Sequence, residues 1–311
     1  MLLPILRSVF VQQNCSKINF SDSDSWTVLS PIEASIKAKI ENIGVPLKKW
    51  DIDIFRGILT GLNEAFIISG EKKNELIAAD PKSAELIRPI LRGRDIKRYV
   101  YVDPDLWLIF IPWHFPLEKE SSITGASKEA EKLFSQRYPA VYNHLLSHKD
   151  KLSKRNQAET GIRYEWYALQ RWGAKYMDDF SKQKVIFQEM VQGPAFCLDN
   201  DKHFICLDTG RIIVGEKLEY LLGLFNSKLF FFAIKHFYGG GGLGGSGVRM
   251  KHTFFQQFSA YIPSQEEEEY FKTITKDAIS AEVSADIDNF FYEKYALSTE
   301  EIDLIESDFK L

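Results

Sequence analysis

The 311-residue chain has few of the features that mark secreted or membrane proteins. It contains only three cysteines, an odd number that argues against a disulfide framework and fits a reducing compartment. No segment offers the ~20 uninterrupted apolar residues of a membrane span, and the nearest one, 218–234, is broken by Asn226 and Lys228. The apolar start Met1–Phe10 contains a proline and an arginine and precedes no small-residue cleavage site. We therefore expect a cytoplasmic protein that does not contact a membrane.

Excess positive charge is also missing from the chain as a whole, which carries a net charge of −4. The distribution is uneven, because residues 266–311 hold fourteen Asp/Glu against four Lys/Arg, a net of −10, and the remaining 265 residues have a net of +6. Local positive surface decides phosphate binding, so the net charge does not exclude a nucleic-acid partner. We expect the acidic end to be a solvated helix face turned away from such a partner; contact with a basic protein is the alternative.

A basic segment lies between Lys82 and Tyr101, where six Lys/Arg accompany two acids. Gly93 separates Arg92 from Arg94 in this segment. The planar fork of an arginine matches phosphate oxygens and the guanine edge, and nearby aromatic rings can stack on bases. The segment therefore indicates nucleic-acid binding, and a solvated charged turn is the alternative reading.

A glycine-bracketed turn precedes this segment. Gly57 and Gly61 enclose Thr60, and Asn63 is a common turn residue. The apolar run Ala65–Ile68 that follows predicts a buried strand. We interpret these glycines, Thr60, Asn63 and Gly93 as residues that shape loops.

Several segments, in order, carry a resemblance to a known family. They are Trp50–Phe66, Asp80-Pro81, Ile87–Tyr99, Trp107–Phe110, Arg137–Ala140, Trp166–Leu169, Lys184–Phe187, Leu221–Leu229 and Ile287–Leu297. Together they resemble the TaqI-like C-terminal specificity domain, the target-recognition region of adenine-specific DNA methyltransferases and type IIG restriction-modification enzymes. The resemblance covers roughly residues 26–306.

The resemblance implies sequence-specific recognition of double-stranded DNA in a prokaryotic cytoplasm, close to the nucleoid. The catalytic motifs of such methyltransferases are absent: the sequence has no Pro-Pro pair, hence no Asn-Pro-Pro-Tyr motif, and no glycine-rich S-adenosylmethionine loop after a strand. We therefore expect no catalysis and no cofactor in this chain alone. The resemblance implies that S-adenosylmethionine, with Mg²⁺ as a further possibility, serves a parent methyltransferase or methyltransferase–nuclease core, in cis or in trans.

Hydrophobic spacing and turn residues divide the chain into candidate elements. They are an irregular segment over 1–22, a helix over Pro31–Asn42, strands and turns over 50–115, a polar helical hairpin over 127–155, strands over 184–214 with a hairpin turn at Asp199–Lys202, a helix over 216–237, and C-terminal helices over Glu266–Glu282, around Ile287–Tyr295 and from Ser298. The predicted fold class is α+β. We expect a lead-in segment (1–45), a mixed-strand target-recognition domain (46–215) and a helical scaffold (216–311).

A glycine-rich run over 239–247 has seven glycines in nine residues. It follows a helix and lacks the Gly-Lys-Ser/Thr ending of a nucleotide-binding loop. It is either a flexible linker or a loop that orders on DNA and brings Arg249 and Lys251 to the backbone.

These patterns give a set of candidate DNA contacts. The first-rank residues are Arg92, Arg94, Lys97, Arg98, Lys154, Arg155, Arg249 and Lys251; the second-rank residues are Arg163, Trp166, Arg171 and Gln188. We expect the lysines to contact phosphate and the arginines and Gln188 to read base edges.

Other chemistries have weaker support in the sequence. Cys197, His203 and Cys206 offer three zinc ligands without a suitably spaced fourth, so a packing role is favoured and no metal site is predicted. Asp53 with Glu71–Lys73 crudely resembles a nuclease carboxylate–lysine set, for which a charged surface turn is the better reading. A free-standing nuclease or nucleotide-dependent enzyme, or a protein-interaction scaffold, remain the alternative functions.

Overall fold

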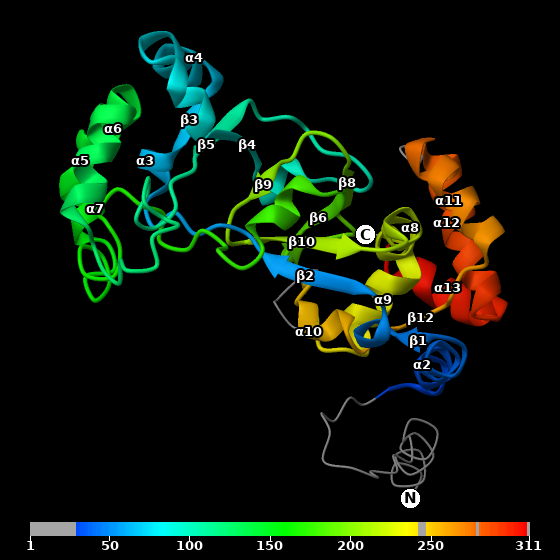
Figure 1. Cartoon of the computed structure of the whole chain (residues 1–311). Coiled ribbons are helices and arrows are strands. Elements are labelled where there is room, and N and C mark those ends of the chain that lie inside the picture. The colour runs from blue at the N-terminus through cyan, green and yellow to red at the C-terminus, as the bar shows by residue number, and fades with distance from the viewer. Residues whose placement is uncertain (1–28, 242–246, 278–279, 310–311) are drawn as a thin grey trace, which may run out of the picture.

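The computed structural model describes residues 29–241, 247–277 and 280–309, and it confirms the predicted α+β class (Figure 1). The helices are α2 (Pro31–Ile43), α3 (Asn63–Phe66), α4 (Gly70–Ala79), α5 (Lys128–Arg137), α6 (Pro139–Leu146), α7 (Lys149–Lys154), α8 (Leu218–Asn226), α9 (Lys228–His236), α10 (His252–Phe255), α11 (Gln265–Asp277), α12 (Ala281–Lys294) and α13 (Thr299–Ser307). The strands are β1 (Val45–Pro46), β2 (Ile52–Arg56), β3 (Ile67–Ser69), β4 (Ile87–Leu91), β5 (Leu106–Ile109), β6 (Lys184–Gln188), β7 (Met190–Val191), β8 (Phe196–Asp199), β9 (Ile205–Cys206), β10 (Gly210–Gly215), β11 (Val248–Arg249) and β12 (Ser259–Ala260).

The central sheet has the strand order β2-β10-β6-β8, and all its pairs are antiparallel. Its inner strands are buried on both faces, because alternate residues enter two different cores. Val185 and Phe187 of β6 belong to the core shared with the C-terminal helices, whereas Ile186 belongs to the core of the first half of the chain. Since a strand's side chains alternate between faces, a continuous apolar run such as that of β6 suits a sheet covered on both sides.

A second sheet has the order β3-β5-β4-β9, in which β9 runs parallel to β4. Because β8 belongs to the central sheet and β9 to this one, the hairpin predicted at Asp199–Lys202 is wrong. The Asp199 carboxylate accepts hydrogen bonds from the backbone N–H groups of Lys202 and Phe204 and pairs with buried Lys184 at 2.7 Å. These bonds turn the chain away from β8 and toward the second sheet.

The first half of the chain contains more helix than the sequence predicted. Residues 63–66 form the short helix α3 before β3, so the predicted strand over Ala65–Ile68 is right only at its end. Helix α4 was missed, although Ser69 caps it by accepting from Lys72 N–H, because its first six residues contain no apolar side chain and so show no helical hydrophobic spacing. The predicted hairpin over 127–155 comprises three helices, α5 to α7, and Pro139 starts the second of them.

The apolar helix predicted over 216–237 is two helices, α8 and α9, which meet at Ser227. The Ser227 hydroxyl accepts from Phe230 N–H at 3.1 Å and donates to the Leu224 carbonyl at 2.6 Å, so it caps α9 and closes α8. Likewise, the single helix predicted over Glu266–Glu282 is α11 followed by α12. The bounds of α2 and the start of α13 at Ser298 confirm the predictions, and Ser298 forms a capping box with Glu301.

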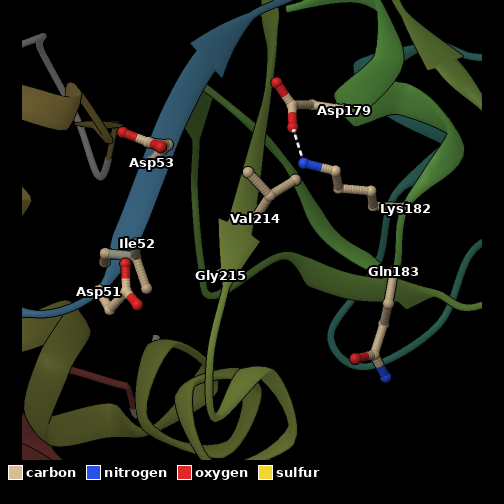
Figure 2. A pocket seen from close by; sticks show the side chains of 8 residues that line it. All are labelled: Asp51, Ile52, Asp53, Asp179, Lys182, Gln183, Val214 and Gly215. Atoms are coloured by element: carbon tan, nitrogen blue, oxygen red, sulfur yellow. Dashed lines mark hydrogen bonds and ion pairs between the residues drawn. The ribbon is translucent and has the colours of Figure 1, made fainter.

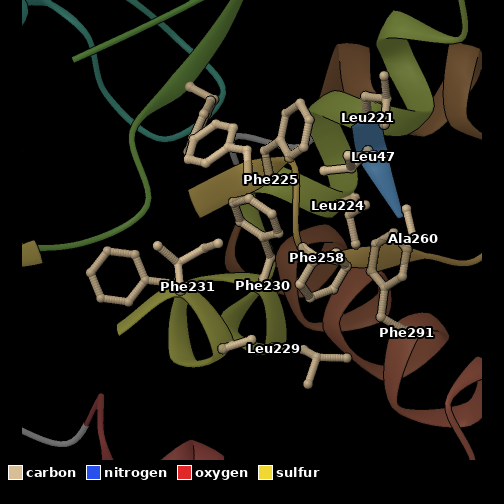
Figure 3. Packing of buried hydrophobic residues seen from close by; sticks show 14 of the residues in the cluster. Leu47, Leu221, Leu224, Phe225, Leu229, Phe230, Phe231, Phe258, Ala260 and Phe291 are labelled. Carbon is tan, nitrogen blue, oxygen red and sulfur yellow. The ribbon is translucent and has the colours of Figure 1, made fainter. Parts of the chain in front are cut away.

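The C-terminal helices build a hydrophobic core around α8 and α9 (Figure 3). Phe225 and Phe230 pack against Phe258 and the edge of the central sheet, and Gly223 allows Phe271 of α11 to approach α8. The lead-in helix α2 also packs here, where Lys39 pairs with Glu301 of α13 at 2.6 Å, and β1 pairs with β12. The C-terminal helices thus pack on the two helices of the 216–237 segment.

Two predictions concern segments outside the described residues: the irregular segment 1–22, and residues 242–246 of the glycine-rich run. Within the described ranges, none of the helices has both the length and the apolar character needed to span a bilayer.

Candidate nucleic-acid interface

The basic segment folds into β4 and a short 3-10 turn over Gly93–Asp95. Arg92 is tied to Asp95, to which it donates from the backbone N–H (2.9 Å), Nε (2.8 Å) and Nη2 (2.9 Å). This hydrogen bonding raises the pKa of Arg92; it also holds the pKa of Asp95 below its usual range, although burial acts in the opposite direction. Arg92 therefore braces the turn, whereas the Arg94 and Lys97 side chains project into solvent.

Arg94 and Lys97 line a cavity of about 310 Å³ together with Gln188, the last residue of β6. We call it the Gln188 pocket. Gly93 packs directly on the Gln188 side chain, so a Cβ at this position would displace the Gln188 amide. The opposite wall is the segment Met190–Ala195.

A second cavity of about 400 Å³, the Arg249 pocket, lies next to the first, since Met190 lines both. The two-stranded ribbon of β7 and β11 pairs Met190 with Arg249 and so joins the two pockets. Four basic side chains line the Arg249 pocket against two acidic ones. They are Arg56, Arg211, Arg249 and Lys251, with Glu189 and Asp208, and His252 completes the wall.

Glu189 organises the charges of the Arg249 pocket. Arg56 and Arg211 lie directly opposite each other on β2 and β10. Two like charges in this position repel each other and destabilise the strand pair. The Glu189 carboxylate accepts from Arg211 Nη2 and, at 2.8 Å, from Arg249 Nε. Burial raises the pKa of Glu189, but the Arg249 hydrogen bond and the charge of Arg211 outweigh it and leave the pKa below the ordinary glutamate value. The carboxylate is thus an internal counter-anion among four cations.

Several cations on this face make no direct bond to a carboxylate. Among the described residues, Arg94, Lys97, Arg56 and Lys251 make neither a hydrogen bond nor an ion pair through their side chains. Such cations are available to external phosphates, and each phosphate that they neutralise releases condensed counterions from the nucleic acid.

Besides Arg92, three predicted contacts are held by partners inside the protein. Arg155 is 9% exposed and donates to the carbonyls of Thr60, Trp166 and Ala168, which joins two loops. Arg98 donates to the Asn226 carbonyl at 2.9 Å and pairs with Asp288 of α12 at 3.2 Å. The Trp166 ring is buried and donates to Glu131 at 2.7 Å. We leave these three out of the proposed contact set, because their polar groups are already satisfied inside the protein.

The remaining predicted residues lie on the first half of the chain. Arg163 and Arg171 both pair with Glu159 at 2.7 Å, and both guanidinium groups lie near the Trp113 ring, at 5.5 and 5.7 Å from its centroid. Lys154 is exposed at the end of α7. The structure does not bring these three residues into either pocket.

The predicted loop-shaping residues at positions 57–63 lie in the turn that follows β2. Gly57 lets β2 approach the Leu207 carbonyl, a distance that a Cβ would prevent, and Gly61 has φ +77°, in the left-handed region. The Thr60 hydroxyl donates to Asn63 Oδ1 at 2.6 Å. Within the same turn, Leu59 forms an isolated antiparallel bridge with Arg171.

The zinc and nuclease alternatives find no support in the geometry. Within the described ranges, no group of three or more His, Cys, Asp or Glu side chains is placed to hold a metal ion. Burial raises the pKa of Cys206 to about 12, as expected of an inert packing thiol. Asp53 lies on β2, away from Glu71–Lys73 of α4, in a cavity of about 350 Å³ (Figure 2).

That cavity contains a different carboxylate–lysine group. Asp179 pairs with Lys182 at 2.7 Å, whereas the Asp51 and Asp53 carboxylates lie apart from this pair in Figure 2. Because the carboxylates do not converge, they offer no metal-binding arrangement, and the cavity gives no basis for nuclease chemistry.

Sequence reasoning missed Arg56, Glu189, Met190 and Arg211. Arg56 directly precedes the glycine turn, which was a usable signal. Glu189 and Met190 directly follow the nominated residue Gln188, which was also a usable signal. Arg211 reaches the pocket only when β10 pairs with β2 and β6, and no local pattern in the sequence indicates this pairing.

The sequence and the fold of the chain were each compared with those of known proteins. No family model matches the chain. The chain is similar to a type II methyltransferase. This relative is the type II methyltransferase M.MjaIV of Methanocaldococcus jannaschii, which is 26% identical over 233 residues, covering 72% of this chain and 69% of that protein.

The fold is similar to part of the type IIL restriction-modification enzyme MmeI, solved in complex with DNA. The TM-score is 0.51 at 15% identity, and the match covers 86% of this chain and 37% of MmeI. The type IIG restriction endonuclease BpuSI gives a TM-score of 0.44 at 14% identity over 85% of this chain and 33% of that enzyme. The chain thus spans little more than a third of the MmeI length.

Proposed function

We propose that this chain is a sequence-specific double-stranded DNA recognition module that serves a restriction-modification adenine-N6 methyltransferase. Its part is to bind the target duplex, while methyl transfer from S-adenosylmethionine belongs to a catalytic core that acts in cis or in trans. The similarity to a type II methyltransferase and the shared fold with part of MmeI support a role in restriction-modification.

The observation that carries the proposal is the pair of adjoining pockets on either side of Met190. Arg94 and Lys97 lie in one pocket and Arg56 and Lys251 in the other, and among the described residues none of the four side chains forms an ion pair. Phosphate contacts from such cations position a protein on the duplex, and groups between them can reach base edges.

The proposal places the duplex across the β7–β11 ribbon, with the acidic helix α11 outside the contact. Glu266, Glu268 and Glu269 of α11 line a separate surface pocket with Lys272, and neither DNA-facing pocket includes them. Keeping these carboxylates away from phosphates avoids like-charge repulsion. This arrangement agrees with the charge division along the sequence.

The test is selection from a random pool of duplex DNA with the purified chain, across a salt series, followed by sequencing of the bound fraction. The expected result is an enriched motif and an affinity that falls steeply with salt. A chain that binds no duplex at low salt, or binds every sequence equally, contradicts the proposal and favours a protein-interaction scaffold.

A further inference from the structure

Gln188 differs from its neighbours in the Gln188 pocket because it carries no charge. It ends β6, where its backbone pairs with Gly210 of β10. Its side chain is half-buried, and within the described residues its amide makes no hydrogen bond. A half-buried amide that has both a donor and an acceptor unused is prepared for a partner from outside.

The position of this amide is restricted by the turn opposite. Gly93 packs so closely on the Gln188 side chain that any Cβ there would overlap the amide carbon. Arg92 and Asp95 lock that turn through three hydrogen bonds, so the surface against which Gln188 lies is itself rigid. A side chain that is already held in its binding position distinguishes one base from another more sharply, because little conformational entropy is lost when the base binds.

The chemistry of the amide selects its partner. A phosphate oxygen would use only the N–H₂ group, whereas the major-groove edge of adenine offers an acceptor at N7 and a donor at N6. The Gln188 Nε2–H group can donate to N7 while Oε1 accepts from the N6 amino group. Arg94 and Lys97 flank the amide, where they can hold phosphates of the same duplex.

The geometry points to Gln188 as a specificity-determining residue that reads an adenine, and hence one A·T pair of the target site, from the major groove. This inference rests on the proposed DNA-recognition function and adds the identity of one recognised base. Gly93 acts through Gln188 as a positioning residue.

The test repeats the selection from random duplex DNA with the full chain and its variants. Wild type should give a motif with an adenine column. Gln188→Arg should convert that one column to guanine, because arginine pairs with guanine O6 and N7, and Gln188→Leu should leave it degenerate. Replacing the adenine in the wild-type site should weaken binding by about 5- to 150-fold, and in Gln188→Leu by less than about 2-fold.

Two further variants control for charge and for folding. Gln192→Arg adds the same charge at the same pocket and should strengthen binding to all sequences without changing a column. Gly93→Ala should weaken the preference for adenine at that column and leave the other columns unchanged. The double variant Gly93→Ala/Gln188→Leu should select the same motif as Gln188→Leu, since both substitutions act on one contact.

The outcomes separate the two claims. If wild type enriches a motif that stays the same in every column in Gln188→Arg and Gln188→Leu, the assignment of Gln188 is overturned while DNA recognition stands. If wild type enriches no motif, both the recognition function and the assignment are overturned. The unchanged columns in each variant show that it has folded.

Discussion

At the residue scale, the charges around Glu189 support the proposal that the Arg249 pocket binds anions. Four basic side chains gather there with two acidic ones, and the Glu189 carboxylate bonds only two of the four, Arg211 and Arg249. The Arg249 side chain is 49% exposed, so it can exchange the carboxylate for a phosphate at little cost. In our account, Glu189 holds the cations together in the free protein and competes with DNA for Arg249.

Glu189→Gln should therefore change DNA affinity and stability in opposite directions. Removing the negative charge should strengthen binding to duplex DNA at low salt and steepen the log–log salt slope by ~1, because Arg249 becomes available to phosphate. The free energy of unfolding should fall at neutral pH, since the two arginines lose their counter-anion. Fluorescence anisotropy and urea unfolding measure the two effects.

The stability loss in Glu189→Gln should depend on pH. The pKa of Glu189 is lowered by folding, so its contribution is present above the unfolded value of ~4.3 and is lost as pH falls through the lower folded value. The difference in unfolding free energy between wild type and variant should thus shrink in acid. A difference that is unchanged at pH 3 would contradict the ion-pair account.

Arg155 has a structural role that is open to the same kind of measurement. Arg155→Ala should lower the unfolding free energy by about 3–4 kcal/mol, because it removes the donor for three carbonyls inside the protein. Arg163→Ala is the matched control, since this exposed arginine pairs at the surface and should cost less than about 1 kcal/mol. If urea unfolding gives the same loss of unfolding free energy for both variants, the hydrogen bonds of Arg155 do not stabilise the contact between its two loops.

The sequence predicted some of these residues and misjudged others for a physical reason. Arg94 and Lys97 were identified from local charge density, and the structure leaves both exposed. Arg98 and Arg155 belong to equally basic stretches, yet their partners are 190 and 95 residues away in the chain, at Asp288 and Thr60. Charge can be read from a sequence, whereas the distant carbonyls and carboxylates that satisfy it become known only from the fold.

At the scale of elements, local signals succeeded where capping chemistry decides the boundary. Pro31 with the Ser30–Glu33 box starts α2, and the Ser298–Glu301 box starts α13. The errors arise where tertiary contacts decide, as at Asp199, whose bonds send β8 and β9 into different sheets. The break at Ser227 was missed because the apolar pattern continues through it on both helices.

The contact between α8 and α11 gives a prediction at this scale. Gly223→Ala should lower the unfolding free energy by about 1–3 kcal/mol, because the added methyl group would overlap the Phe271 ring. Gly193→Ala is the control, since a Cβ there meets no atom within 4 Å and should have little effect on stability. Thermal unfolding of both variants makes the comparison, and a stable Gly223→Ala would contradict the packing described for α11.

At the scale of the whole molecule, the basic turn and the helical scaffold are joined by one buried ion pair. Asp288 of α12 is 3% exposed at its side chain and receives Arg98 at 3.2 Å and the Lys228 N–H at 2.8 Å. Burial raises the pKa of Asp288 in spite of Arg98. The turn that presents Arg94 and Lys97 is therefore anchored through Arg98 to a helix near the opposite end of the chain.

Arg98→Ala should destabilise the protein by about 3–5 kcal/mol at neutral pH, because it leaves a buried carboxylate without its main counter-ion. The pKa of Asp288 should then rise further, and a protonated carboxyl needs no cation. The destabilisation relative to wild type should therefore decrease as pH falls from 7 to 4. Urea unfolding at several pH values tests this, and a loss that grows toward pH 4 would contradict the account.

The central claim is that the face on either side of Met190 binds duplex DNA through its unpaired cations. The most direct measurement is the salt dependence of duplex affinity for wild type and for Arg94→Ala/Lys97→Ala. Lys182→Ala, which removes a 64% exposed cation in a separate cavity, is the matched control. We predict that the double variant flattens the log–log salt slope by ~2 and that the control leaves it unchanged. Equal slopes for all three proteins would contradict the claim.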